Sequence, residues 1–314
     1  MRAVVFGSSG QDGSLLSLSL LKQGYELVGV SRSYASVSPT HQALGIAESI
    51  NYVTADLCDF RSVLQIFKQY QPDEVYNLAA QSSVAESFKQ PSNTFNSIIN
   101  GTVNLLEVAR FCESPARLFF AGSSESYGNS SLPATVQTPR LPTSPYAIAK
   151  DAAFHVVKLY REAYHLNCVT GVLFNHESPY RASSFVTRKI INGALRCASD
   201  SGFFLQLGNL DVSRDWGWAS EYVEAMQLLL RAKHLSDQLI CTGRMVSLRY
   251  FVEQAFSRVG LNWQEHVELQ PALLRPSEIL QSVGDPEPMA VHTGWRATKD
   301  VDAVIDALLE AARA

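Results

Sequence analysis

Features that would point to a membrane, a metal or a nucleic acid are missing from this sequence. No apolar run approaches the roughly 20 residues that span a bilayer, and the formal net charge of -4 gives no basic field for a nucleic acid. The five cysteines are scattered, without the Cys-x-x-Cys or His-x-x-x-His pairs that suit a metal. We therefore expect a globular protein with reduced cysteines, no metal, and neither a membrane nor a nucleic-acid partner.

The start of the chain leads almost directly into a predicted strand. Met1 is followed closely by the apolar run Ala3–Phe6, which leaves no room for the charged and apolar regions of a signal peptide. We therefore expect the protein in the cytoplasm.

Apolar, β-rich runs alternate with amphipathic segments over residues 1–174. This alternation predicts an α/β fold with a Rossmann-type, doubly wound parallel sheet. Ligands of such sheets bind beyond the carboxyl ends of the strands. The predicted strands are Ala3–Phe6, Leu27–Val30, Tyr52–Val53, Val75–Leu78, Leu118–Ala121 and Val169–Phe174.

The chain shows no linker and no internal repeat, so a second lobe must be built from its later segments. We place a dinucleotide-binding domain at 1–174, with segments at about 205–245 returning to it, and a smaller, mainly C-terminal substrate-binding lobe at 175–314. The expected lobe elements are helices at 184–198, 218–232 and 247–259, with short strands Leu205–Leu207 and Leu239–Cys241 threading between the two parts.

A glycine-rich turn, Gly7-Ser-Ser-Gly10-Gln-Asp-Gly13, joins the first strand to a helix predicted to begin near Ser14. Glycine permits a tight turn and lets backbone N–H groups approach a pyrophosphate at the N-terminus of the helix. The predicted cofactor-binding residues of this turn are Gly7, Ser9, Gly10, Gln11, Asp12 and Gly13.

The end of the second strand indicates which dinucleotide is bound. Sites that prefer NAD usually place an acidic residue here, whereas this chain has Arg32, which can bind a ribose 2′-phosphate. We therefore predict NADP; the alternative is a solvated arginine. Asp56 and Leu57, after the third strand, are predicted to meet adenine or else to form a plain strand-end turn.

Tyr146 and Lys150 are four residues apart on a predicted helix and so share one face. A nearby ammonium can stabilise a phenolate and turn tyrosine into a base. Lowering its pKa from near 10 to about 7 requires roughly 4 kcal/mol. Taken alone, the pair is also compatible with an ordinary exposed helix edge.

Together these motifs resemble the extended short-chain dehydrogenase/reductase superfamily and, within it, the GDP-mannose 4,6-dehydratases. The resemblance covers nearly the whole chain. Its most specific parts are Gly10-Gln-Asp-Gly13, Tyr76-Asn-Leu-Ala-Ala-Gln-Ser82, Phe174-Asn-His-Glu-Ser-Pro179, Phe185-Val-Thr-Arg-Lys189, Arg214-Asp-Trp-Gly217, Tyr222-Val-Glu-Ala-Met226 and Leu274-Arg-Pro-Ser-Glu278.

The resemblance implies a mechanism with four catalytic residues. Tyr146, supported by Lys150, would take the proton of the sugar 4-hydroxyl while NADP accepts a hydride from carbon 4. Glu125 would then remove the proton on carbon 5 and assist loss of the 6-hydroxyl as water. Ser123 would bind the sugar hydroxyl, although the family usually has threonine there. Tyr146 and Lys150 would also contact the cofactor, as would Leu78, Ala79 and Ala80.

The resemblance also implies a pocket for the GDP-sugar. Arginine suits the diphosphate because its planar fork meets phosphate oxygens bidentately. His176 is expected to be structural, since Tyr146, Lys150 and Glu125 already cover proton transfer. The implied substrate-binding residues are Ser82, Asn175, Val186, Lys189, Arg214, Arg275 and Glu278.

Two departures from the family pattern leave alternatives open. Ser33 replaces a second arginine that helps to build the family's tetramer, so we expect a homodimer, with a tetramer as the alternative. Thr143 stands where the family has an arginine near the active site, so the substrate could instead be a related sugar such as a GDP-heptose. Two other functions remain, a reductase or epimerase of a GDP-4-keto sugar and a catalytically silent NADP-binding regulator.

Overall fold

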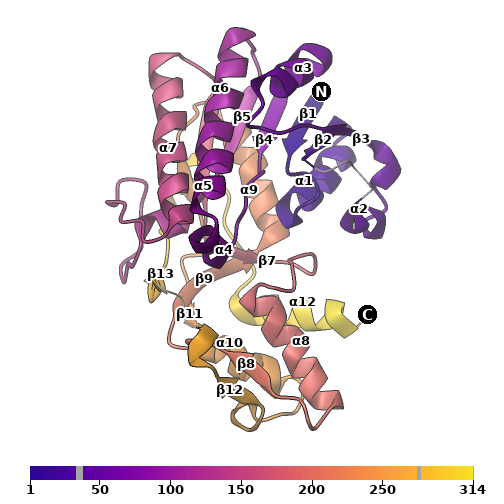
Figure 1. Cartoon of the computed structure of the whole chain (residues 1–314), viewed down its shortest axis with the longest axis vertical. Coiled ribbons are helices and arrows are strands. Elements are labelled where there is room, and N and C mark those ends of the chain that lie inside the picture. Colours follow the sequence, from indigo (N-terminus) through magenta and orange to yellow (C-terminus); the bar gives the residue numbers. More distant parts are fainter. Residues whose placement is uncertain (33–37, 274–276, 314) are drawn as a thin grey trace.

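A seven-stranded parallel sheet forms the centre of the computed structural model, which describes residues 1–32, 38–273 and 277–313. The strand order is β10-β6-β5-β4-β1-β2-β3, and the part from β5 to β3 is labelled in Figure 1. The predicted doubly wound α/β sheet is thereby confirmed. The strands are β1 (Arg2–Phe6), β2 (Glu26–Ser31), β3 (Ile50–Thr54), β4 (Glu74–Asn77), β5 (Arg117–Ser123), β6 (Cys168–Leu173) and β10 (Gln238–Ile240).

Helices cover both faces of this sheet, which explains why its strands are apolar throughout. Alternate strand residues point to opposite faces, so Val5 packs in one core cluster and its neighbour Val4 in another. One face carries α1 (Gln11–Lys22) and α9 (Ala219–Arg231), and the other carries α3 (Phe60–Tyr70), α6 (Gly101–Phe111) and α7 (Pro145–Ala163).

Three sequence-based expectations are corrected here. The helix expected at 218–232 in the lobe is α9, which packs against α1 on the Rossmann sheet, because its apolar face includes Tyr222 and Met226. The first helix begins at Gln11 and not near Ser14. Of the two short strands expected to thread between the parts, β10 joins the large sheet and β8 (Leu205–Leu207) belongs to the lobe.

The lobe lies beyond the carboxyl ends of the large sheet (Figure 1). Its centre is β9 (Ser213–Trp218), which pairs with β11 (Met245–Ser247), β13 (Gln281–Ser282) and β7 (Asn175–Glu177). A separate apolar core unites the lobe helices with the pair β8 and β12 (Val267–Leu269). The lobe helices are α8 (Val186–Ser199), α10 (Leu248–Ser257) and α12 (Val301–Arg313).

Shorter elements complete the described chain. They are the helices α2 (Pro39–Ala43), α4 (Val84–Lys89), α5 (Pro91–Phe95) and α11 (Glu287–Thr293), the 3-10 helices η1 (Ala47–Ser49), η3 (Ser124–Tyr127), η4 (Trp263–Glu265) and η5 (Pro271–Leu273), and the π-helical turn η2 (Asn96–Asn100).

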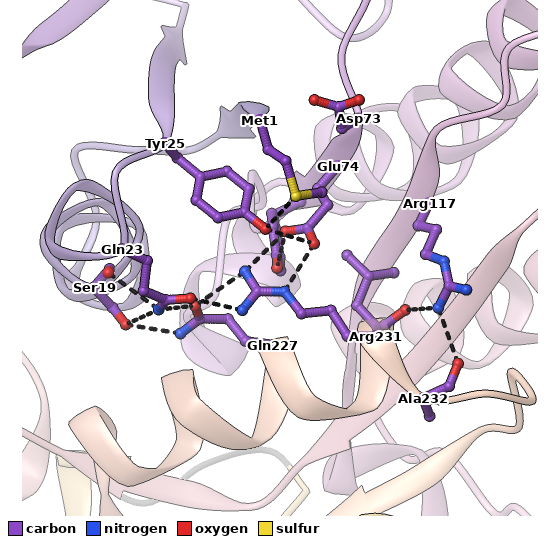
Figure 2. Close-up of polar contacts among 12 residues, drawn as sticks. Met1, Ser19, Gln23, Tyr25, Asp73, Glu74, Arg117, Gln227, Arg231 and Ala232 are labelled. Carbon is purple, nitrogen blue, oxygen red and sulfur yellow. Dashed lines mark hydrogen bonds and ion pairs between the residues drawn. The ribbon is translucent and has the colours of Figure 1, made fainter.

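An ion pair between the buried Glu74 and the partly exposed Arg231 fastens α9 to the sheet (Figure 2). Glu74, which is 1% exposed, accepts hydrogen bonds from Arg231 Nε at 2.8 Å and from the Tyr76 hydroxyl at 2.8 Å. Arg117 Nη1 donates to the carbonyls of Leu230 and Ala232, both at 2.9 Å, and so binds the C-terminal end of α9. These contacts lie at the amino-terminal edge of the sheet, opposite the ends where ligands of such folds bind.

We expect Glu74→Gln to lower the free energy of unfolding by about 2 kcal/mol, because the Arg231 guanidinium, whose side chain is 31% exposed, loses a charged hydrogen-bond partner. Urea unfolding measures the change. Glu26→Gln is the matched control, since the Glu26 side chain paired with Arg2 is 57% exposed; its expected cost is below about 1 kcal/mol. Equal costs for the two variants would contradict the role assigned to Glu74.

Candidate active site

The glycine-rich turn lies at the carboxyl end of β1, where its shape depends on two glycines. Gly7 has φ +81°, and a Cβ on it would lie 2.8 Å from the Ala79 backbone nitrogen. A Cβ on Gly13 would lie 2.1 Å from the Gly7 carbonyl oxygen. The turn therefore packs backbone to backbone, which side chains at these positions would prevent.

This turn fits the diphosphate of a dinucleotide. The N-cap of α1 is Gly10. Because glycine has no side chain, no N-cap side chain accepts a hydrogen bond from the first N–H groups of the helix. Ser9 and Gly10 are exposed. A helix N-terminus with accessible N–H groups attracts anions, so Ser9, Gly10, Gln11 and Gly13 are suitably placed to hold a pyrophosphate.

The residues predicted to meet the adenosine end follow β2 and β3. Arg32 and Asp56 are exposed at the ends of these strands. Leu57 is 6% exposed and its side chain belongs to the core, so only its backbone is available to a ligand. Ser33 lies outside the described residues.

Tyr146 and Lys150 lie in the first turns of α7, where local sequence fixes the start of the helix. The Ser144 hydroxyl accepts a hydrogen bond from Ala147 N at 3.1 Å, and Pro145 occupies the first turn. Lys150 Nζ donates to the Ala121 carbonyl at 2.7 Å and lies 5.8 Å from the centre of the Tyr146 ring. The helix therefore presents both side chains to the carboxyl end of β5.

The protonation of this pair differs from the sequence-based expectation. Burial raises the pKa of Tyr146 to about 12, against the hydrogen bond with Ser123, which lowers it. Burial also lowers the pKa of Lys150 to about 8. Removing the phenol from water therefore outweighs the groups that favour its anion.

Ser123 and Glu125 complete a cluster around Tyr146. Ser123 ends β5, is 8% exposed, and accepts a hydrogen bond from Glu125 N at 3.3 Å in addition to its bond with Tyr146. The Glu125 carboxylate is close enough to raise the pKa of Tyr146. The structure therefore brings together a hydroxyl, a carboxylate, a phenol and, through Lys150, an ammonium.

An ion pair that the sequence analysis missed joins the glycine-rich turn to the lobe. His176 Nε2 lies 2.9 Å from Asp12 Oδ2, and its ring stacks on Tyr222 with 4.6 Å between the ring centres. Burial would lower the pKa of His176, but Asp12 outweighs it and raises the pKa. Burial would likewise raise the pKa of Asp12, yet His176 lowers it. This pairing supports the structural role expected for His176.

Arg181 is a second residue that sequence reasoning missed. Its Nη1 donates to the His176 carbonyl at 2.8 Å, and its Nε lies 3.1 Å from the buried Glu177 carboxylate. The only sequence signal was its position shortly after the Asn-His-Glu motif. Arg181 also lowers the pKa of Tyr146, so its charge acts at the cluster around Tyr146.

The residues expected to bind substrate come mainly from the lobe. Arg214, on β9, is 6% exposed and its Nη2 lies 3.3 Å from Glu278 Oε1. Val186 and Lys189 share the first turns of α8. Asn175 begins β7, and Ser82 is exposed after β4. Arg275 lies outside the described residues.

Neither a metal cluster nor a membrane span is found where the structure is described. No three His, Cys, Asp or Glu side chains among residues 1–32, 38–273 and 277–313 form a group that could hold a metal ion. Over the same ranges, no helix is both long and apolar enough to cross a bilayer.

Comparison with known proteins links this geometry to one group of enzymes. A family model described as GDP-mannose 4,6 dehydratase matches residues 4–308. GDP-mannose 4,6 dehydratase 1 of Arabidopsis thaliana is 39% identical, over 99% of this chain and 90% of that protein. GDP-mannose 4,6-dehydratase of Sinorhizobium fredii is 37% identical, over 94% of this chain and 91% of that protein.

Solved structures agree on the fold. UDP-glucose 4-epimerase of Thermus thermophilus in complex with NAD superposes with a TM-score of 0.85 at 26% identity, covering 98% of this chain and 99% of that chain. The dTDP-glucose 4,6-dehydratase of Streptomyces venezuelae with NAD gives a TM-score of 0.88 at 22% identity, covering 100% of this chain and 96% of that chain.

Proposed function

The chain belongs to the GDP-mannose 4,6-dehydratase family, and from this we propose that it converts GDP-D-mannose to GDP-4-keto-6-deoxy-D-mannose and water. The observation that carries the proposal is the cluster of Ser123, Glu125 and Tyr146 beside Lys150 at the carboxyl end of β5. An alcohol dehydrogenase needs one acid/base group, whereas a dehydratase needs a second one placed next to the first. Glu125 is that second group.

The residues divide the work between two proton transfers. Tyr146 takes the proton of the sugar 4-hydroxyl, with Ser123 as its hydrogen-bond partner and the Lys150 ammonium favouring the phenolate. A nicotinamide dinucleotide held at the glycine-rich turn would supply the redox chemistry, as a hydride acceptor toward carbon 4 and a hydride donor toward carbon 6. The resulting ketone acidifies carbon 5, whose proton Glu125 removes before protonating the departing 6-hydroxyl. Tyr146 then returns its proton to carbon 5 as hydride reaches carbon 6, so one water leaves and no net oxidation occurs.

The two parts of the chain divide the ligands. Residues 1–174 mainly hold the cofactor and residues 175–314 mainly hold the GDP-sugar. Support comes from the glycine-rich turn in the first part and from the buried Arg214 in the second. Around Arg214, the proposed sugar-nucleotide contacts are Ser82, Asn175, Val186, Lys189, Arg275 and Glu278.

The protein binds a nicotinamide dinucleotide, and we assign it as NADP because Arg32 is exposed at the end of β2. We expect Arg32→Ala to weaken NADP binding about tenfold and to leave NAD binding nearly unchanged, since only NADP carries the 2′-phosphate that forms charge-assisted bonds with arginine. Calorimetric titration of both dinucleotides measures this. Tighter binding of NAD than of NADP by the wild type would overturn the assignment.

A homodimer is the proposed assembly, with a tetramer as the alternative. Two neighbouring helices carry exposed large apolar side chains, namely Ile148 (45%) and Leu159 (54%) on α7 and Phe111 (64%) on α6. If the same two helices of a second copy packed against α6 and α7, these side chains would be removed from water. Sedimentation velocity of the wild type and of Leu159→Glu tests the surface, and an unchanged mass for the variant would exclude it.

The cytoplasm is the proposed location. Its support is that all five cysteines are free, including the buried Cys168 and Cys241, as is usual in a reducing compartment. Cell fractionation tests it, and recovery outside the cytoplasm would contradict it.

Mass spectrometry of the product tests the reaction directly. Purified protein with GDP-mannose and catalytic NADP should yield a product about 18 mass units lighter, with the cofactor pool unchanged. Conversion of GDP-manno-heptose alone would assign a related sugar instead. Reduction or epimerisation of the 4-keto sugar would assign the reductase or epimerase, and NADP binding without any turnover would assign the silent regulator.

A further inference from the structure

Asn129 connects the segment that carries Glu125 to the lobe. It follows the 3-10 helix η3 closely, and its side-chain Oδ1 accepts two hydrogen bonds, from Leu280 N at 3.1 Å and from Gln281 N at 2.8 Å. A single side-chain oxygen thus binds two consecutive backbone N–H groups of a segment more than 150 residues away in sequence.

The chain beyond Asn129 continues this contact as a short ladder. Ser130 N donates to the Gln281 carbonyl at 2.9 Å, and Ala134 N donates to the Val283 carbonyl at 2.9 Å. Asp285 N in turn donates to the Ala134 carbonyl at 2.8 Å, which makes a parallel bridge between Ala134 and Gly284. Asn129 stands at the beginning of this ladder, nearest to Glu125.

The partner segment leads directly to the proposed nucleotide clamp, the ion pair of Arg214 and Glu278. Leu280 accepts a hydrogen bond from Ser213 N at 2.7 Å, and Ser282 pairs with Arg214 across β13 and β9. Leu280 is also two residues from Glu278. The two amides bound by Asn129 are therefore held in register with the clamp.

The path from Glu125 to Asn129 has little freedom. Gly128 N donates to the Glu125 carbonyl at 3.2 Å, and Gly128 has φ +67°. A Cβ on Gly128 would lie 2.3 Å from the Leu141 carbonyl oxygen, so the glycine is packed tightly against the opposing loop. A displacement of Asn129 would consequently be passed on to Glu125.

We propose that Asn129 is a positioning residue that fixes the spacing between Glu125 and the Arg214–Glu278 clamp. This inference rests on the proposed function, in which one nucleoside-diphosphate sugar must reach both places at once. When the clamp holds the nucleotide, the position of the hexose relative to Glu125 is set by the contacts that join the two segments. Asn129 makes the first of these contacts.

We expect Asn129→Ala to lower kcat/KM for GDP-mannose by about 10- to 100-fold, because displacements of about 1 Å cost rates of this order. The Kd for GDP alone should stay within about twofold, since GDP reaches only the clamp. Asn129→Asp keeps an acceptor oxygen at the same place and should recover most of the lost kcat/KM. Loss of stability alone would lower the active fraction, which appears as a reduced stoichiometry of GDP binding in the titration, so kcat/KM is expressed per GDP-binding site.

Asn262→Ala is the matched control. Asn262 also uses its Oδ1 to accept a backbone hydrogen bond, from Gln264 N at 3.3 Å, at the start of η4 in the lobe. Its removal should leave both kcat/KM and the Kd for GDP unchanged.

Steady-state kinetics and calorimetric titration of GDP and GDP-mannose decide the question. Asn129 is not a positioning residue if the alanine variant keeps kcat/KM within twofold, if its affinity for GDP falls as much as kcat/KM, or if the aspartate variant recovers nothing. A wild type that binds GDP-mannose without converting it would refute the proposed function alone. In that event the test is the affinity for GDP-mannose divided by the affinity for GDP. This ratio should fall in Asn129→Ala and stay at the wild-type value in Asn129→Asp.

Discussion

Replacing Tyr146 by phenylalanine should lower kcat for GDP-mannose dehydration by about 10³-fold or more, because general acid/base groups contribute up to roughly 10⁴-fold. The ring stays, so packing around this buried side chain is preserved. Only the hydroxyl is lost, which bonds Ser123 and which we propose takes the proton of the sugar 4-hydroxyl. Product formation followed by mass spectrometry measures the change.

Tyr160→Phe is the control for the Tyr146 substitution. Tyr160 lies on the same helix, and its hydroxyl donates to Glu107 Oε1 at 2.6 Å, away from the catalytic cluster. This variant should retain kcat within about threefold, as expected for a residue with no role in proton transfer. A Tyr146→Phe protein with near-wild-type turnover would remove Tyr146 from the mechanism.

Replacing Glu125 by glutamine should lower dehydration by about 10²- to 10⁴-fold through a different step. Glutamine has nearly the shape of glutamate but cannot accept the proton of carbon 5. Incorporation of solvent deuterium at carbon 5, measured by NMR, should therefore be lost together with product formation. The affinity for GDP should not change, since we propose that the nucleotide binds at Arg214.

Glu224→Gln provides the comparison for Glu125. Glu224→Gln removes the same charge as Glu125→Gln. Because Glu224 is exposed on α9, its replacement should not affect the cluster around Tyr146. Its kcat and its deuterium incorporation should equal those of the wild type. If Glu125→Gln still exchanged the carbon 5 proton at the wild-type rate, another group would have to be the base.

The sequence by itself determined the elements whose cause is local. The alternation of apolar runs with amphipathic segments predicted the parallel sheet, because strands that helices cover on both faces must be apolar throughout. The turn at Gly7 and Gly13 was readable because its shape excludes other side chains. The placement of Tyr146 and Lys150 on one helix face follows from helical periodicity alone. The family resemblance then supplied Ser123 and Glu125, which the structure places beside Tyr146.

The tertiary structure alone decided what depends on segments distant in sequence. The amphipathic pattern of α9 predicts that one face is buried. It does not determine whether that face packs on the sheet or on the lobe, because this depends on which apolar surface lies opposite in the folded chain. The Asp12–His176 pair and the bonds of Asn129 join residues more than 150 positions apart. The protonation of Tyr146 is set by burial, which no local motif encodes. Local sequence limits backbone conformation, whereas desolvation and charge pairing arise only when the folded chain brings distant groups together.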